Sequence, residues 1–97
     1  MGSIRRILAT ASRSSFESRY LRASPRERRV LRAIGQNGES AALKELRDRL
    51  RMGNNELQPV LHILHAKGFV YRPTRGQIAF TTPMFGAFLR RRHDDTE

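Results

Sequence analysis

The sequence predicts a mainly α fold with a small β-hairpin near its C-terminal end. Between residues 4 and 67, apolar side chains recur every three or four positions, which is the period of a helix. Between residues 69 and 81 they form two short runs on either side of a turn at 73–76, which is typical of a hairpin. The chain has 97 residues, enough for one small core and too few for a large enzyme fold with its own cofactor cleft.

The N-terminal segment, residues 1–23, is predicted to be helical with a break. Its apolar positions are interrupted by serines before Phe16 and Tyr20 resume the stripe, and Ser14 followed by Glu17 matches a capping box. We expect this segment to pack on the rest of the domain or on a partner. If the partner is the same segment of a second copy, the protein is a homodimer, and the sequence leaves this open.

Residues 24–92 are predicted to form the domain itself. Ser24, Pro25 and Glu27 supply an N-cap, a proline at the first helical position and a carboxylate at the third, so a helix should begin here. The glycines within 35–38 should end it.

Two further helices are expected before the hairpin. Ser40 is predicted to cap the first of them and Gly53 to end it. The next helix should begin near Pro59 or kink there, which would leave residues 54–58 in an irregular turn, and Gly68 should stop it.

A last helix is expected after the hairpin. Thr82 and Pro83 should cap it, and it should run over residues 84–92. Residues 93–97 are predicted to be a disordered acidic tail. The residues predicted to face inward along the helices are Val30, Leu31, Ile34, Leu43, Leu46, Leu50, Leu57, Val60, Leu61, Leu64, Phe85, Phe88 and Leu89.

The charge balance points to a polyanionic partner. The chain holds 19 Lys and Arg against 9 Asp and Glu, a formal charge of +10. Nearly all of the basic residues are arginines, since Lys44 and Lys67 are the only lysines, and arginine favours bidentate contacts with phosphate. A nucleic acid is therefore the first choice of partner, an anionic membrane surface the second and an acidic protein the third.

Other classes of function are disfavoured by what the chain lacks. The absence of cysteine excludes thiolate nucleophiles, disulfides and Cys-containing zinc sites. His62 and His65 are three positions apart on a predicted helix, but no neighbouring carboxylate completes a metal site. No nucleophile with a base and an orienting group can be assembled, so we expect neither catalysis nor a cofactor. No apolar run approaches the length of a membrane span, and a cytoplasmic location is expected.

The order of elements resembles a winged helix-turn-helix domain over residues 25–82. The resemblance rests on the helix residues Leu43, Leu46, Leu50, Gly53, Leu57, Leu61 and Leu64, and on the run Lys67-Gly68-Phe69-Val70, which is similar to the family's helix end before the wing.

The flanks resemble the C-terminal winged-helix region of prokaryotic P-loop ATPases of the AAA and STAND type. The matching runs are Tyr20-Leu21, Ser24-Pro25-Arg26-Glu27-Arg28, Phe80-Thr81-Thr82-Pro83-Met84-Phe85 and Phe88-Leu89-Arg90-Arg91. This resemblance implies an upstream ATPase domain in a larger protein. No P-loop motif occurs in these 97 residues, so no ATPase activity is expected of them.

The winged-helix resemblance implies binding of double-stranded DNA, with the third helix of the domain in the major groove and the wing on the backbone. The residues then expected to face the bases are Asn54, Asn55, Gln58 and His62, and those expected to hold the backbone are Lys44 and Arg47, with Arg72, Thr74 and Arg75 in the wing.

Two features of the third helix oppose DNA binding. It has no Arg or Lys between Arg51 and Lys67 and carries Glu56 near its start, and Pro59 disturbs the region of the proposed base contacts. The alternative is a protein-docking or regulatory module of a P-loop ATPase, whose arginines form a solvated face. The sequence leaves both uses open.

Overall fold

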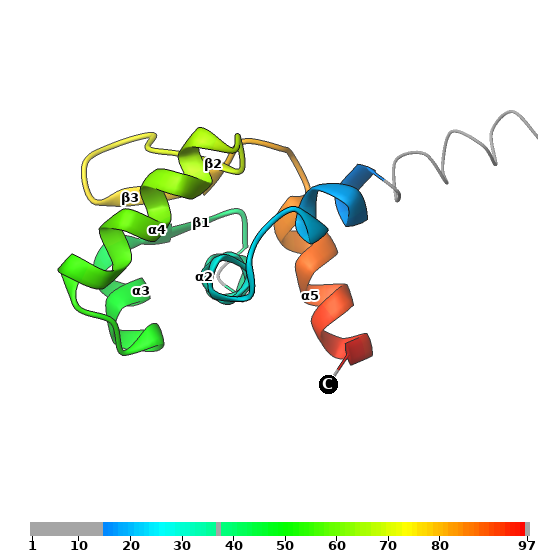
Figure 1. Cartoon of the computed structure of the whole chain (residues 1–97), viewed down its shortest axis with the longest axis horizontal. Coiled ribbons are helices and arrows are strands. Elements are labelled where there is room, and N and C mark those ends of the chain that lie inside the picture. Colours follow the sequence, from blue (N-terminus) through cyan, green and yellow to red (C-terminus); the bar gives the residue numbers. More distant parts are fainter. Residues whose placement is uncertain (1–14, 37, 97) are drawn as a thin grey trace, which may run out of the picture.

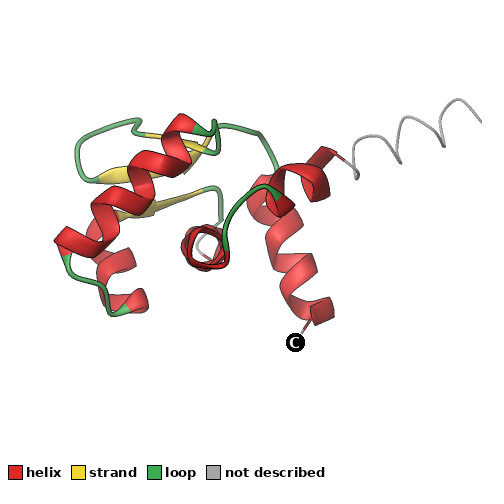
Figure 2. Cartoon of the chain, in the orientation of Figure 1, coloured by secondary structure: helices red, strands yellow, loops and turns green. Residues whose placement is uncertain are grey.

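The computed structural model describes the backbone of residues 15–36 and 38–96, and the side chains as far as residue 92. The protein is mainly helical, with a small antiparallel sheet of three strands (Figures 1 and 2). The labelled elements are α2 (Pro25–Gln36), β1 (Ser40–Ala42), α3 (Leu43–Leu50), α4 (Asn54–Ala66), β2 (Val70–Tyr71), β3 (Gln77–Phe80) and α5 (Phe85–Thr96). A helical stretch at residues 15–21 precedes α2, and the helix start expected at Ser14 lies outside the described residues.

α2 lies between two groups of elements. In Figure 1 it is seen end-on, with α3, α4 and the sheet on one side and α5 with the helical residues 15–21 on the other. The predicted inward faces of the helices are confirmed, because all of those residues are buried except Phe88, which is partly buried. The ring of Phe16 stacks on that of Phe88 with 5.3 Å between centroids, and this contact joins residues 15–21 to α5.

The hairpin prediction is confirmed, but the sheet holds a strand that was not predicted. β3 lies between β1 and β2 and pairs with both in antiparallel register. The prediction that Ser40 caps a helix is wrong, because its backbone pairs with Ala79 in the sheet. α3 begins only at Leu43, where the Leu43 amide donates to the Gly76 carbonyl at 2.9 Å.

The predicted turn before Pro59 is also wrong. α4 begins at Asn54, and Gly53 is its N-cap rather than the end of α3, which stops at Leu50. A proline in the second turn costs one helical hydrogen bond, the one that its missing N–H would donate four residues back. The first turn is held by other groups: the Gly53 amide donates to Glu56 Oε1 at 3.3 Å, and Gln58 donates to Asn54 Oδ1 at 3.2 Å.

α5 begins differently from its prediction. Pro83 is not its first residue: the helix starts at Phe85, after Met84 in the left-handed region at φ 68°, and its backbone continues to Thr96. Glu39, 47 positions earlier than Gly86, caps it by accepting hydrogen bonds from the amides of Gly86 at 3.0 Å and Ala87 at 3.1 Å. A carboxylate at the positive end of a helix also complements its dipole.

The predicted start of α2 is confirmed. The Ser24 amide donates to Glu27 Oε1 at 3.0 Å, and the Glu27 amide donates to Ser24 Oγ at 3.2 Å, which completes a capping box. The Lys67 ammonium lies 2.7 Å from the same Glu27 oxygen. Burial of the Glu27 carboxyl raises its pKa, but the hydrogen bond and charge of Lys67 and the hydrogen bonds at Ser24 outweigh this, so the pKa lies below its ordinary value.

The lowered pKa of Glu27 predicts a pH-dependent contribution to stability. A carboxyl whose folded-state pKa is depressed stabilises the fold above the ordinary value of 4.5, and the contribution is lost as the pH falls below it. We expect Glu27→Gln to lower the free energy of unfolding by about 1 to 3 kcal/mol at neutral pH, and by progressively less in acid. Urea unfolding of both proteins between about pH 7 and pH 3 measures this. An exposed control, Asp48→Asn, should show little effect, and a Glu27→Gln difference that stays constant with pH would contradict the assignment.

Candidate nucleic-acid interface

The structure places every predicted site residue at the surface. Those on α4 are Asn54, Asn55, Gln58 and His62, those in the loop between β2 and β3 are Arg72, Thr74 and Arg75, and those on α3 are Lys44 and Arg47. Gln58 and Arg47 are partly buried and the other seven are exposed.

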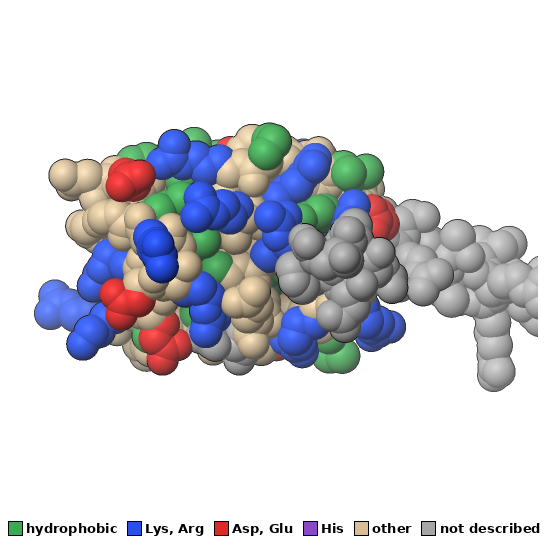
Figure 3. Space-filling view, turned by 90° about the horizontal axis from the view of Figure 1, so that it is seen from below, with side chains coloured by type: hydrophobic (Ala, Val, Ile, Leu, Met, Phe, Trp, Pro, Cys, Tyr) green, Lys and Arg blue, Asp and Glu red, His purple; other side chains and the backbone are tan. Residues whose placement is uncertain are grey.

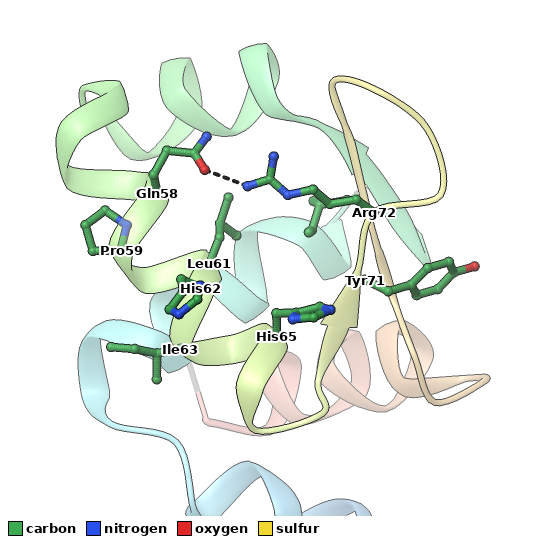
Figure 4. Close-up of a pocket in the computed structure, with 9 residues that line it drawn as sticks. Gln58, Pro59, Leu61, His62, Ile63, His65, Tyr71 and Arg72 are labelled. Carbon is green, nitrogen blue, oxygen red and sulfur yellow. Dashed lines mark hydrogen bonds between the residues drawn. The ribbon is translucent and has the colours of Figure 1, made fainter.

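A chain of hydrogen bonds joins the polar face of α4 to the loop. Asn54 and Gln58 are one helical turn apart, so their side chains meet, and Gln58 in turn accepts a hydrogen bond from Arg72 at 2.5 Å (Figure 4). His62 lies one further turn along α4 and lines the same surface groove as Gln58 and Arg72. The structure therefore brings four of the predicted residues, from two elements, onto one continuous surface.

The start of α3 lies beside the same loop. The Leu43 amide nitrogen donates to the Gly76 carbonyl oxygen at 2.9 Å. Lys44 is the residue after Leu43 and Arg75 is the residue before Gly76, so this bond brings their backbones close together. Arg47 lies one helical turn after Lys44. Among the described residues, the recorded ion pairs include none of Lys44, Arg47, Arg72 and Arg75. Lys44, Arg72 and Arg75 are also exposed, so an external anion can approach them.

The acidic residue at the start of α4 is partly offset. Glu56 Oε2 lies 3.6 Å from Arg26 Nη2, and both side chains are more than half exposed. An exposed pair of this kind contributes little to stability, but it places a positive charge beside the carboxylate. The repulsion expected between Glu56 and a phosphate backbone is thereby reduced.

The groove beside α4 also carries apolar and imidazole groups. Ile63 and Tyr71 are 41% and 43% exposed, and His62 and His65 are exposed as well (Figure 4). Within the described residues, no three His, Cys, Asp or Glu side chains lie together in a group that could hold a metal ion. In the same residues, no helix is both long and apolar enough to cross a membrane.

Several arginines serve a structural purpose that the sequence reasoning missed. Their guanidinium groups donate to carbonyls near the C-terminal ends of other helical segments, where the backbone lacks partners. The recorded bonds run from Arg28 to Tyr20 and Leu21 at 3.2 and 2.9 Å, from Arg29 to Leu50 at 3.2 Å, from Arg49 to Ala33 at 3.0 Å and from Arg90 to Gly35 at 2.7 Å. Since each bond joins separate segments, no short-range sequence signal could have found it.

Basic side chains are numerous on one face of the molecule. Figure 3 shows Lys and Arg spread over the middle of the face seen from below the view of Figure 1, with Asp and Glu mainly at one end. Exposed arginines also occur outside the residues predicted to contact DNA, among them Arg29, Arg51 and Arg91.

These features define a small, basic, mainly helical domain in which a polar helix and a hairpin loop share one surface. The chain belongs to the family described as a domain of unknown function (DUF8462), whose model matches residues 13–89. The match spans the helical residues 15–21 as well as the sheet, and it stops within α5. No curated protein and no solved structure matches the chain.

Proposed function

We propose that this domain is a winged helix-turn-helix that binds double-stranded DNA, largely through contacts between arginine and phosphate. The observation that carries the proposal is the surface shared by α4 and the loop, linked through Gln58 and Arg72. α3 and α4 then correspond to the helix-turn-helix, α4 to the recognition helix, and the loop between β2 and β3 to the wing.

The side chains on this surface suit the two kinds of contact that DNA requires. Asn54, Asn55 and Gln58 can pair bidentately with adenine from the first turns of α4, and a major groove is wide enough to admit a helix. Arg72 and Arg75 in the loop and Lys44 on α3 are exposed cations that phosphate oxygens can approach. The formal charge of +10 would add long-range attraction toward the duplex.

The docking alternative has its own support. α4 carries no Lys or Arg, and the groove beside it exposes Ile63 and Tyr71, side chains more typical of a protein contact than of a phosphate contact. A regulatory module attached to a P-loop ATPase domain would use this groove against a protein partner.

A salt-dependent titration distinguishes the two uses. The anisotropy of a labelled random duplex is measured against the 97-residue chain at about 50 and 200 mM salt, with labelled polyglutamate as the acidic control. DNA binding predicts duplex affinity that falls steeply with salt and exceeds the affinity for polyglutamate. Absent binding, or equal binding to both polymers, would reject the proposal in favour of the docking module.

A further inference from the structure

A second basic pocket lies away from the proposed DNA surface. Its lining comes from the helical residues 15–21, the turn after them and the turn after α4, and consists of Arg19, Arg22, Lys67, Gly68 and Phe69. Its volume is about 260 Å³, below the range of pockets for drug-sized ligands. A small ligand, or one group of a larger ligand, fits such a space.

The turn after α4 shapes the floor of this pocket. The helix ends at Ala66, Lys67 keeps a right-handed conformation and Gly68 adopts φ 84°, a value that glycine reaches without strain. The Gly68 amide donates to the His65 carbonyl at 3.0 Å and the Phe69 amide to the Leu64 carbonyl at 2.9 Å. The backbone amides are thus already bonded within the protein, and the side chains are what remain for a ligand.

Internal contacts hold two of the three cations in place. Lys67 Nζ donates to the Arg22 carbonyl at 3.1 Å and to Glu27 Oε1 at 2.7 Å, and Arg19 Nη1 donates to Thr82 Oγ1 at 2.9 Å. A side chain that is already oriented loses less freedom when it binds a ligand.

The charges around the pocket do not cancel. Glu27 offsets Lys67, but the ion pairs of the described residues include neither Arg19 nor Arg22. Both guanidinium groups line the same hollow, and no carboxylate of the described residues pairs with either of them. An anion that bridged them would remove their mutual repulsion and accept their remaining N–H groups.

We propose that Arg19, Arg22 and Lys67 form a binding site for a phosphate group. Guanidinium groups match the oxygen spacing of phosphate. A terminal or inorganic phosphate, with a charge of about −1.5 to −2 at neutral pH, nearly balances two arginines, and a backbone phosphodiester, with a single charge, balances one of them. The phosphate belongs either to a nucleic-acid backbone or to a separate small molecule. The pocket lies at the C-terminal end of α4, about 20 Å along the helix from Asn54 and about 8 Å from His62, so His62 alone of the proposed base-reading residues lies near it.

The site is tested with inorganic phosphate on the whole chain. Amide resonances of Gly68 and Phe69 are followed by NMR during a phosphate titration at constant ionic strength, with chloride as the reference salt. The expected result is saturating shifts at these two amides, with affinity falling about tenfold in Arg22→Ala because one charged contact is lost. The side chain of Arg22 is exposed and makes no hydrogen bond or ion pair within the part of the chain that the structure describes, so its removal should leave the fold intact. Arg91→Ala removes an equal charge from an exposed position on α5 and should bind phosphate like the unchanged protein.

The same variants identify the source of the phosphate. If a duplex backbone occupies the pocket, Arg22→Ala should reduce the salt slope of duplex binding by about 0.9, whereas Arg91→Ala should not. An unchanged slope together with loss of phosphate binding assigns the pocket to a separate phosphate-bearing molecule. The site is rejected if phosphate moves the pocket amides no more than chloride does and Arg22→Ala also leaves the duplex slope unchanged. Because the phosphate titration contains no DNA, its outcome is independent of whether the domain binds a duplex.

Discussion

Replacing Arg72 and Arg75 together by alanine is expected to weaken duplex binding by about 30- to 100-fold at about 0.1 M salt. Both guanidinium groups lie in the exposed loop between β2 and β3, and neither takes part in a recorded ion pair of the described residues. Each phosphate contact that is lost should reduce the salt slope by about 0.9, giving a total change close to 1.8. Removing Arg72 also frees Gln58, whose side chain it holds, so part of the loss should appear as relaxed sequence preference.

The matched comparison for this result uses single substitutions. Arg75→Ala and Arg91→Ala each remove one exposed arginine, the first from the loop and the second from α5. Anisotropy titrations at several salt concentrations should show a reduced slope only for the loop variant. Equal salt slopes for both variants would mean that net charge alone governs binding. The proposed contact between the wing and the DNA backbone would then be rejected.

Replacing Gly86 by alanine is expected to lower the free energy of unfolding by about 3 kcal/mol or more. A Cβ at this position would overlap the carbonyl oxygen of Gly38 and lie 2.7 Å from Glu39 Oε2. The start of α5 would have to move away, and Glu39 would then lose the amides of Gly86 and Ala87. For a small domain this is a large fraction of the total stability.

Gly53→Ala is the matched control for Gly86→Ala. Gly53 has φ −73°, and a Cβ there would meet nothing closer than Glu56 Oε1 at 3.9 Å. Its loss should be at most about 1 kcal/mol, since alanine is a poorer N-cap than glycine. Urea unfolding compares the two variants. A Gly86→Ala protein as stable as Gly53→Ala would show that α5 shifts without cost.

The parts of the fold predicted correctly depend on neighbouring residues. The capping box of α2 lies within four consecutive residues, so Ser24 and Glu27 reveal it directly. The buried faces of the helices follow from the period of the apolar residues. The hairpin follows from the turn residues 73–76 between two apolar runs.

The errors arose where a distant segment decided the local structure. Residues 40–42 resemble a helix start by themselves, and they form β1 because β3 offers an edge to pair with. The start of α5 is set by Glu39 and not by the adjacent Pro83. The irregular turn expected before Pro59 followed from a local rule, which the hydrogen bonds of the first turn of α4 override.

The candidate site divides in the same way. The exposure of its polar residues on α4 follows from the amphipathic pattern, which the sequence displays. The link between Gln58 and Arg72, and the meeting of Arg19, Arg22 and Lys67, require elements far apart in the chain to pack together. Such contacts leave no trace in the spacing of neighbouring residues.

The arginines that donate to helix-end carbonyls also affect how much the protein surface can rearrange around a ligand. A guanidinium carries five N–H groups, and a bond to one carbonyl uses only one or two of them. Arg29 and Arg90 are held in this way, and both remain exposed. Such bonds should make these side chains stiffer than free lysines, while the donors that the carbonyl does not use are left for a ligand. A surface built from such groups offers fixed hydrogen-bond donors to an anion. It therefore discriminates between anions by their shape as well as by their charge.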